Sequence, residues 1–314
     1  MKILVTGGAG FIGSHIVEMY QGKAEEIRVL DNLRTGYRHN LEGLEHTFIE
    51  GSITDRDLVR KAVEGVDYIF HLAALVSVPE SMEKPGECVD INVHGLLNVL
   101  EEASAAGVRK LVFASSAAVY GDNPTVPKIE SMLPEPKSPY AITKLDGEYY
   151  LGMFQQEGRL ETAAIRFFNV FGPRQDPKGA YAAAVPTFIE KAVRNEDITV
   201  FGDGEQTRDF IYVKDIAGAL SFAVETPGVT GVFNAGYGGQ ITINDLGVRI
   251  ISAAGSSSNV LNGPERAGDV KHSRASADKL RAAGWKPMHS LEEGLATTLI
   301  FFANKFISPG NPTA

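Results

Sequence analysis

The chain has 314 residues, 44% hydrophobic and 22% charged, which is typical of a globular protein large enough to bury a core without disulfides. Its net charge of −9 argues against non-specific nucleic-acid binding, which depends on neutralising phosphates. The single cysteine, Cys88, excludes an intrachain disulfide and fits a reducing compartment, so we expect a cytoplasmic protein. No apolar run approaches the ~20 residues that span a bilayer, and we expect neither a signal peptide nor a membrane partner.

Residues 1–170 alternate short apolar runs with helical patterns. Runs of this kind are typical of parallel strands buried on both faces, and strand–helix alternation predicts a doubly wound sheet. The expected helices are 11–21, 55–63, 89–106 and 139–157. The expected strands are 3–6, 27–30, 47–50, 68–72, 110–114 and 162–168.

Residues 171–314 are richer in glycine and proline, which predicts a smaller, mixed α/β substrate domain. Helices are expected at 184–194, 213–225, 243–253 and 275–283. The apolar run Val232–Ala235 is a candidate extra strand of the first sheet, so the domain boundary is expected to be interleaved, with residues 205–240 returning to the first domain.

A glycine-rich segment, Gly7–Gly13, follows the first strand and opens the first helix. Alone it could mark any turn, but in this position it predicts a backbone that approaches a pyrophosphate at a helix N-terminus. Asp31 ends the second strand, 18 residues beyond Gly13, where a carboxylate can accept bonds from the adenosine ribose. This favours NAD, although Arg34 and Arg38 keep NADP open as an alternative.

Tyr140 and Lys144 lie four residues apart and therefore share one face of a predicted helix. A nearby ammonium favours the phenolate, so the pair can exchange a proton with a substrate hydroxyl while hydride moves to a nicotinamide. Ser115 and Ser116 end the strand 110–114, where α/β proteins bind ligands. A surface Tyr–Lys pair and strand-terminating serines are the non-functional alternatives.

Taken in chain order, these motifs resemble the extended short-chain dehydrogenase/reductases, and specifically the UDP-glucose 4-epimerases. The resemblance covers nearly the whole chain and implies a Rossmann-type α/β fold, bound NAD, a UDP-sugar substrate and a homodimer joined through the helices near 90–105 and 144–157. The segments that carry it are Gly7–Gly13, Asp31–Leu33, His71–Ala74, Ser115–Gly121, Tyr140–Lys144, Arg166–Asn169 and Arg208–Phe210.

The resemblance also implies site residues. The catalytic group would be Ser116, Tyr140 and Lys144. The cofactor would contact Gly7, Gly10, Phe11, Ile12, Gly13, Asp31, Asn32, Thr35, Gly36, Ser52, Ile53, Leu72, Ala73, Ala74, Asn92, Tyr140, Lys144 and Phe167. The nucleotide-sugar would contact Ser77, Ser116, Tyr140, Asn169, Ala183, Ala184, Phe201, Arg208, Arg266, Asp269 and Ser273. Two positions depart from the family pattern, because relatives usually carry Asp at position 52 and some carry Lys at position 76, where this chain has Ser52 and Val76.

The residues after Ser116 indicate which reaction the family resemblance favours. Related 4,6-dehydratases carry an Asp–Glu pair where this chain has Ala117 and Ala118, which can move no proton. We therefore expect NAD-dependent 4-epimerisation of a UDP-hexose through a transient 4-ketopyranose. Another nucleotide-sugar dehydratase or reductase remains the alternative, and a non-catalytic NAD-binding scaffold is disfavoured because Tyr140 and Lys144 are both present.

The resemblance also predicts which sugars the substrate pocket accepts. A bulky tyrosine at the position of Ser273 is associated with glucose and galactose only, whereas a small residue leaves room for an N-acetyl group. The stretch 179–186 also resembles epimerases that use UDP-N-acetylhexosamines. We thus expect activity on UDP-GlcNAc/UDP-GalNAc, on UDP-Glc/UDP-Gal, or on both. The seven histidines show no ligand spacing, so no metal site is expected.

Overall fold

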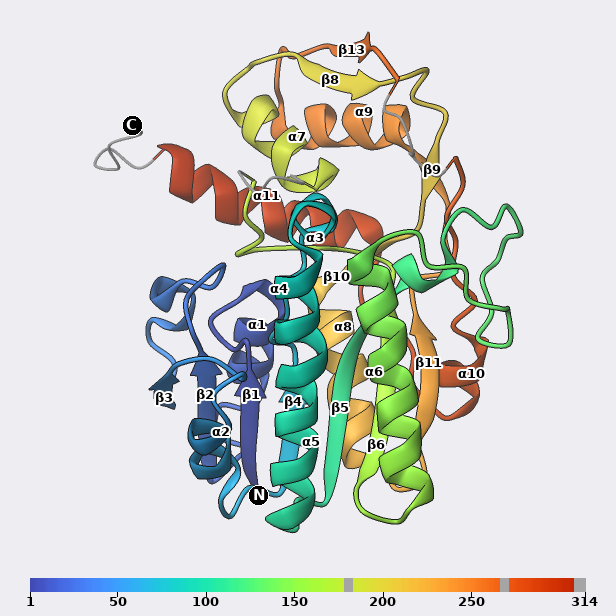
Figure 1. Cartoon of the computed structure of the whole chain (residues 1–314). Coiled ribbons are helices and arrows are strands. Elements are labelled where there is room, and N and C mark those ends of the chain that lie inside the picture. Colours follow the sequence, from blue (N-terminus) through green and yellow to red (C-terminus); the bar gives the residue numbers. More distant parts are fainter. Residues whose placement is uncertain (178–182, 266–270, 308–314) are drawn as a thin grey trace.

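The computed structural model describes residues 1–177, 183–265 and 271–307. Its centre is a seven-stranded parallel sheet in the order β11-β6-β5-β4-β1-β2-β3 (Figure 1). This confirms the predicted Rossmann-type α/β fold, and the candidate extra strand lies in β11, which pairs with β6. The strands are β1 (Lys2–Thr6), β2 (Glu26–Asp31), β3 (Thr47–Glu50), β4 (Tyr68–His71), β5 (Lys110–Ser116), β6 (Glu161–Phe167) and β11 (Gly231–Ala235).

Helices cover both faces of the sheet, because consecutive strand residues point to opposite sides. Ile3 and Val5 of β1 enter the core with α1 and α8, whereas Leu4 between them enters the core with α2, α5 and α6. Figure 1 shows α5 and α6 in front of the sheet and α8 behind it. On one face lie α1 (Phe11–Met19), α8 (Val213–Glu225) and α10 (Asp278–Ala282); on the other lie α2 (Arg56–Val63), α5 (Gly95–Ala105) and α6 (Pro139–Gln156).

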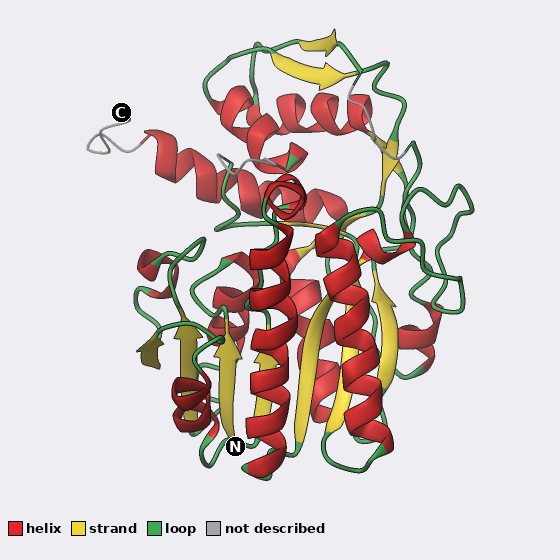
Figure 2. Cartoon of the chain, viewed as in Figure 1, coloured by secondary structure: helices red, strands yellow, loops and turns green. Residues whose placement is uncertain are grey.

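The second part of the chain forms a smaller mixed layer above the carboxyl edge of the sheet (Figures 1 and 2). Three small sheets, β7–β10, β9–β12 and β8–β13, accompany its helices. The elements are β7 (Asn169–Phe171), α7 (Ala184–Val193), β8 (Ile198–Phe201), β9 (Thr207–Arg208), β10 (Phe210–Tyr212), β12 (Ile241–Thr242), α9 (Ile243–Ala254), β13 (Val260–Gly263) and α11 (Leu291–Ile307). The domain division at residue 170 stays a prediction. Although α8 and β11 follow residue 170 in the chain, α8 covers the large sheet and β11 is one of its strands, whereas the elements beside them in sequence lie in the upper layer.

The structure also differs from the sequence-based expectations. The helix expected at 89–106 begins with a π-helical turn, η2 (Asp90–His94), and only then continues as α5. Three helices were not expected: α3 (Val78–Glu83), α4 (Pro85–Val89) and α11. Gly294 and consecutive threonines weaken the helical signal of α11, which gains its stability from tertiary burial of side chains such as Phe302. Within the described residues, none of the helices has the length and apolar character needed to cross a membrane.

An ion cluster joins the two parts of the chain. Glu18 of α1 accepts hydrogen bonds from Arg174 at 2.6 Å and from Lys214 of α8 at 3.0 Å. The contact with His15, reinforced by these two cations, holds the pKa of Glu18 far below its usual range. The cluster therefore fixes the loop after β7 against the first helix of the sheet domain.

Candidate functional site

The turn between β1 and α1 is built so that only glycine fits it. Gly7 has φ +71°, and a Cβ added there would lie 2.8 Å from the backbone nitrogen of Ala73. A Cβ on Gly13 would lie 2.2 Å from the carbonyl oxygen of Gly7. The helix begins at Phe11 with no side-chain cap at Gly10 and no acidic residue in its first turn. Its first amides are thus available to an anion, which suits a dinucleotide pyrophosphate.

Asp31 lies at the end of β2, beside this turn. Its carboxylate is almost fully buried and accepts hydrogen bonds from the backbone of Ala9 at 3.0 Å and of Leu33 at 2.8 Å. Burial raises the pKa of Asp31. Gly36 packs against this carboxylate, whereas Asn32 and Thr35 are exposed on the same loop. The predicted ribose partner is therefore held against the predicted phosphate turn.

A salt bridge connects the loop after β2 to the helices that follow β4. The guanidinium of Arg34 donates to Glu87 at 2.5 Å and to Glu80 at 2.6 Å. Glu80 lies on α3 and Glu87 on α4, and Lys84 pairs with both. These contacts hold the loop after β2 against the helices that follow β4. The ends of β2 and β4, the two strands beside β1, carry predicted cofactor residues.

The remaining predicted cofactor residues also lie near the carboxyl ends of the strands. Ala73 and Leu72 follow β4, and their amides donate to Thr6 at 3.2 Å. Asn92 holds the same loop by bonding both backbone groups of Leu75. The other predicted positions are Ala74 in this loop, Ser52 and Ile53 after β3, and Phe167 at the end of β6. The fold thus gathers these residues at one edge of the sheet.

Ser116 and Tyr140 meet at that edge. Ser116 is the last residue of β5, and Tyr140 lies in the first turn of α6. Ser138 caps this helix by accepting from Ala141, and Ser81 accepts from the Tyr140 amide at 3.2 Å. A side-chain hydrogen bond with Ser116 lowers the pKa of Tyr140, but burial, the larger effect, raises it.

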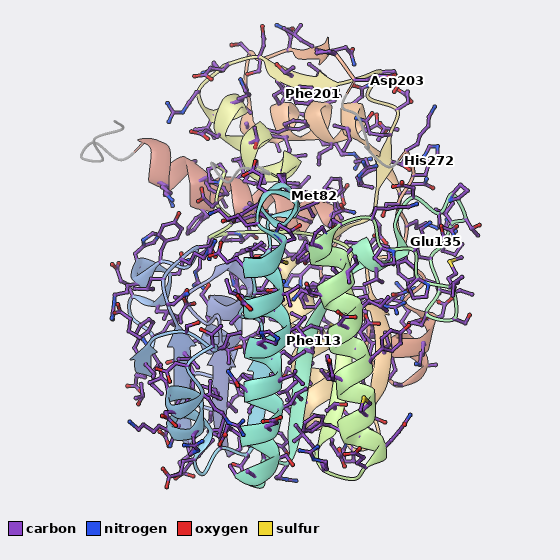
Figure 3. All side chains as sticks on the ribbon, in the orientation of Figure 1. Met82, Phe113, Glu135, Phe201, Asp203 and His272 are labelled. Carbon is purple, nitrogen blue, oxygen red and sulfur yellow. The ribbon has the colours of Figure 1, made fainter. Side chains whose placement is uncertain are left out.

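Lys144 lies one helical turn beyond Tyr140 and is 3% exposed. Its ammonium donates to the Ala114 carbonyl at 2.8 Å and lies 4.7 Å from the Phe113 ring centroid and 5.8 Å from that of Tyr140. Figure 3 labels Phe113 on the central part of the sheet. Burial lowers the pKa of Lys144 to about 8, so the group is still mostly charged at neutral pH.

Two other polar side chains near Tyr140 and Lys144 are buried in the core. His71 is fully buried, lies 2.8 Å from the hydroxyl of Thr6 and stacks on Phe113. Burial lowers the pKa of His71 to about 3, so the ring is neutral and serves as a hydrogen-bonding residue. Cys88 is buried beside Thr143, and burial raises the pKa of its thiol.

The predicted substrate residues come from both parts of the chain. Asn169 begins β7 and donates to the carbonyl of Asp209 at 3.1 Å, and Ser77 caps α3. Phe201 ends β8 in the upper layer, above the carboxyl edge of the sheet (Figure 3). The other positions are Ala183 and Ala184 at the start of α7, Arg208 in β9, and Ser273, whose amide donates to Thr207 in β9. Arg266 and Asp269 lie outside the described residues.

One buried group near Lys144, Glu148, is not among those predicted from the sequence. It lies one turn beyond Lys144 on α6 and forms an ion pair with Arg166 of β6 at 2.7 Å. Its other oxygen accepts from Ser115 at 2.5 Å. The signal was present in the sequence, because Tyr140, Lys144 and Glu148 recur every four residues. Across the described residues, the structure contains no group of three or more His, Cys, Asp or Glu side chains able to hold a metal ion.

The chain is similar to known proteins over nearly its whole length. The model of the NAD dependent epimerase/dehydratase family matches residues 3–236. A UDP-glucose 4-epimerase of Mycolicibacterium smegmatis is 38% identical over 97% of this chain and 99% of its own. The crystal structure of a Thermus thermophilus UDP-glucose 4-epimerase in complex with NAD is 38% identical, with a TM-score of 0.88, over 96% of this chain and 99% of its own.

A further solved structure is similar over nearly its full length. It is a UDP-N-acetylglucosamine 4-epimerase of Methanobrevibacter ruminantium in complex with UDP-N-acetylmuramic acid, with 40% identity and a TM-score of 0.93 over 97% of this chain and 99% of its own. The glycine turn, the strand-end serine and the helical Tyr–Lys pair all fall inside the residues that the family model matches. The chain therefore belongs to the NAD-dependent epimerase/dehydratase family.

Proposed function

We propose that this protein is a UDP-hexose 4-epimerase that keeps its NAD bound through the catalytic cycle. The observation that carries the proposal is the contact of Ser116 with Tyr140 beside a buried, charged Lys144, at the strand edge that also holds the glycine turn. NAD, when bound, supplies an acceptor and later a donor for the C4 hydride. The chain itself has to bind the sugar, hold it against that edge and move one proton.

The proton passes through Tyr140. Its phenolate accepts the proton of the sugar C4 hydroxyl, and the Ser116 hydroxyl shares that hydrogen bond. Burial raises the pKa of Tyr140, and the hydrogen bond with Ser116 opposes that rise. An ammonium one helical turn away, at Lys144, would favour the phenolate further. After the 4-ketopyranose turns its other face to the cofactor, Tyr140 returns the proton to the same C4 oxygen as the ketone is reduced. The products differ from the substrate only at C4, and no net redox change occurs.

The alternative of a dehydratase needs an additional acid and base beside the sugar. Ala117 and Ala118 begin the helical turn η3 (Ala117–Tyr120) directly after Ser116, and neither side chain can carry a proton. The nearest titratable side chain of that turn is Tyr120, whose hydroxyl is buried and bonded to Arg166 and Asn234. This favours epimerisation over elimination of water.

The proposed cofactor contacts comprise the glycine turn, the Asp31 loop and the loops after β3 and β4, as described above. The proposed substrate contacts include Asn169 and Arg208, with Phe201 stacked on the uracil. Arg266 and Asp269, outside the described residues, complete the proposed grip on the UDP group. A pyrophosphate suits guanidinium groups, which donate two parallel hydrogen bonds.

For the sugar, we propose that UDP-GlcNAc and UDP-GalNAc are accepted, beside UDP-Glc and UDP-Gal. Ser273 is half-buried and small, and its backbone is held by Thr207 of the second layer. One similar solved structure is a UDP-N-acetylglucosamine 4-epimerase, which supports the N-acetyl reading.

The test is incubation of the purified protein with each of the four UDP-sugars and chromatographic resolution of the products. Conversion of each substrate to its C4 epimer, without accumulation of free NADH, is expected. Ser273→Tyr should remove the N-acetyl activity first, and equal loss on both substrate pairs would contradict the assignment of that pocket. A 4-keto-6-deoxy product would instead identify a dehydratase.

We further propose a homodimer formed through α6 and its neighbours. The outer face of α6 exposes Ile142, Tyr149 and Met153, with exposed fractions of 46%, 61% and 53%. These residues are spaced seven and four apart and so form one apolar stripe. Light scattering should give twice the chain mass for the wild type and the chain mass for Tyr149→Glu/Met153→Glu.

The buried single cysteine supports a reducing compartment, and we propose that the protein lies in the cytoplasm.

A further inference from the structure

Glu148 lies on the catalytic face of α6 but makes no contact expected of a catalytic residue. Tyr140, Lys144 and Glu148 follow one another at intervals of four residues, so their side chains line the same face of the helix. Glu148 is 6% exposed. A carboxylate this deeply buried has to be compensated by other groups, and a well-packed apolar residue would often be as stable.

The carboxylate of Glu148 binds the two strands that end at the site. One oxygen accepts from Ser115 at 2.5 Å and from Arg166 Nε at 2.8 Å, and the other accepts from Arg166 at 2.7 Å. Ser115 directly precedes Ser116 and lies opposite Arg166 in the β5–β6 register. The position of the catalytic serine is thus tied to the helix that carries the tyrosine and lysine.

The hydrogen bonds of Glu148 and Arg166 extend to further buried side chains. Arg166 donates to the Tyr120 hydroxyl at 2.8 Å, and Tyr120 donates to Asn234 of β11 at 2.7 Å. Tyr120 closes the helical turn η3 that follows Ser116. The chain of bonds therefore connects α6, β5, η3, β6 and β11, and each of its side chains is buried. Such fully satisfied networks rigidify the elements that they join.

Among the described residues, few titratable groups lie near Lys144. Tyr140 and Glu148 lie on its own helix, Cys88 on α4 and His71 on β4; β5 contributes a backbone carbonyl and a ring. His71 is neutral, and the raised pKa of Cys88 keeps its thiol protonated at neutral pH. Within the parts of the chain that the structure describes, Cys88 and then Glu148 are the groups whose negative charge would favour the ammonium of Lys144. With the Cys88 thiol protonated, the Glu148 carboxylate, which is ion-paired with Arg166 of β6, counteracts the loss of charge that burial favours.

We propose that Glu148 is a positioning residue for the proton transfer: its charge keeps Lys144 an ammonium, and its bond to Ser115 fixes the strand end that carries Ser116. The catalytic consequence rests on the proposed function, whereas the effect on Lys144 does not. Opposite charges one turn apart on a helix face, in a partly polar interior, shift a titration by on the order of one pH unit.

The first experiment compares wild type with Glu148→Gln in two measurements. The titration of Lys144 is followed by NMR of lysine labelled at Cε, with the signal assigned by its loss in Lys144→Met. The pH dependence of kcat is measured on the best UDP-hexose. In Glu148→Gln, the Lys144 midpoint and the alkaline limb of kcat should both move about one unit to lower pH. An unmoved Lys144 midpoint would overturn the proposal, even for a protein that turns over none of the sugars.

Two variants serve as controls. Glu102 of α5 is also buried and paired with two arginines, but these lie on α2, away from the site. Glu102→Gln should leave both titrations unchanged, and a matching shift there would overturn the proposal. Ser115→Ala keeps the charge of Glu148 but removes the bond to the strand end. This variant should lower kcat several-fold and leave the alkaline limb of kcat unmoved. An undiminished kcat would overturn the inference that the bond of Glu148 to Ser115 positions Ser116.

Glu148→Gln leaves Arg166 buried without a counter-ion, which can prevent folding. The double variant Glu148→Gln/Arg166→Met removes both charges and retains side chains of similar volume. The Lys144 midpoint in this variant should still lie below that of the wild type, because the carboxylate is absent. A wild-type midpoint in the double variant would show that the ion pair only packs, and would overturn the proposal.

Discussion

Gly13→Ala tests how the glycine turn accommodates the cofactor. The added Cβ would lie 2.2 Å from the Gly7 carbonyl oxygen and 2.7 Å from the Cα of Gly8. Both neighbours are backbone atoms, so the clash can be relieved only by moving the turn by about 1 Å. Overpacking of this kind costs about 1–3 kcal/mol, and a shift of ~1 Å in a binding loop can weaken a positioned contact about a hundredfold.

The assay is the NAD content of the purified protein, together with its melting temperature. Gly13→Ala should melt about 2–8 °C below the wild type and co-purify with little NAD. Gly86→Ala is the matched control, because a Cβ there meets nothing within 4 Å and the backbone has no positive φ. A Gly13→Ala protein with full NAD content and an unchanged melting temperature would refute the packing argument for this turn.

Three further predictions follow from charged groups. Because burial lowers the pKa of Lys144 to about 8, kcat should decline as pH rises through about 8, where the ammonium is lost; a plateau extending past pH 9.5 would contradict this. Arg34→Met should speed NAD release about two- to fivefold in a dilution assay, since partly exposed ion pairs contribute up to ~1 kcal/mol, whereas Arg38→Met should not. Because the pKa of Glu18 is depressed in the folded protein, its ionised form stabilises the fold above pH ~4.5, and this stabilisation is lost on acidification. The free energy of unfolding in urea should therefore fall more steeply with decreasing pH for the wild type than for Glu18→Gln.

The sequence by itself determined the fold class and the strand ends at which the proposed cofactor residues lie. Mainly apolar runs such as Ile27–Leu30 and Lys110–Ala114 lie within observed strands, because a parallel strand buried on both faces needs mostly apolar side chains. The glycine turn was predictable because the constraint is local: a positive φ at Gly7 and contacts too close for a Cβ. The spacing of Tyr140 and Lys144 was local too, since one helix carries both.

Only the tertiary structure decided how the sites on different elements meet. The contact of Ser116 with Tyr140 joins a strand end to a helix N-terminus 24 residues later, and no periodicity encodes that distance. The bonds of Glu148 to Ser115 and Arg166 depend on the β5–β6 register and on how α6 lies over the sheet. Local spacing could show which side chains share a helix face, but the charge that Lys144 carries depends on burial and on neighbours that only packing brings together.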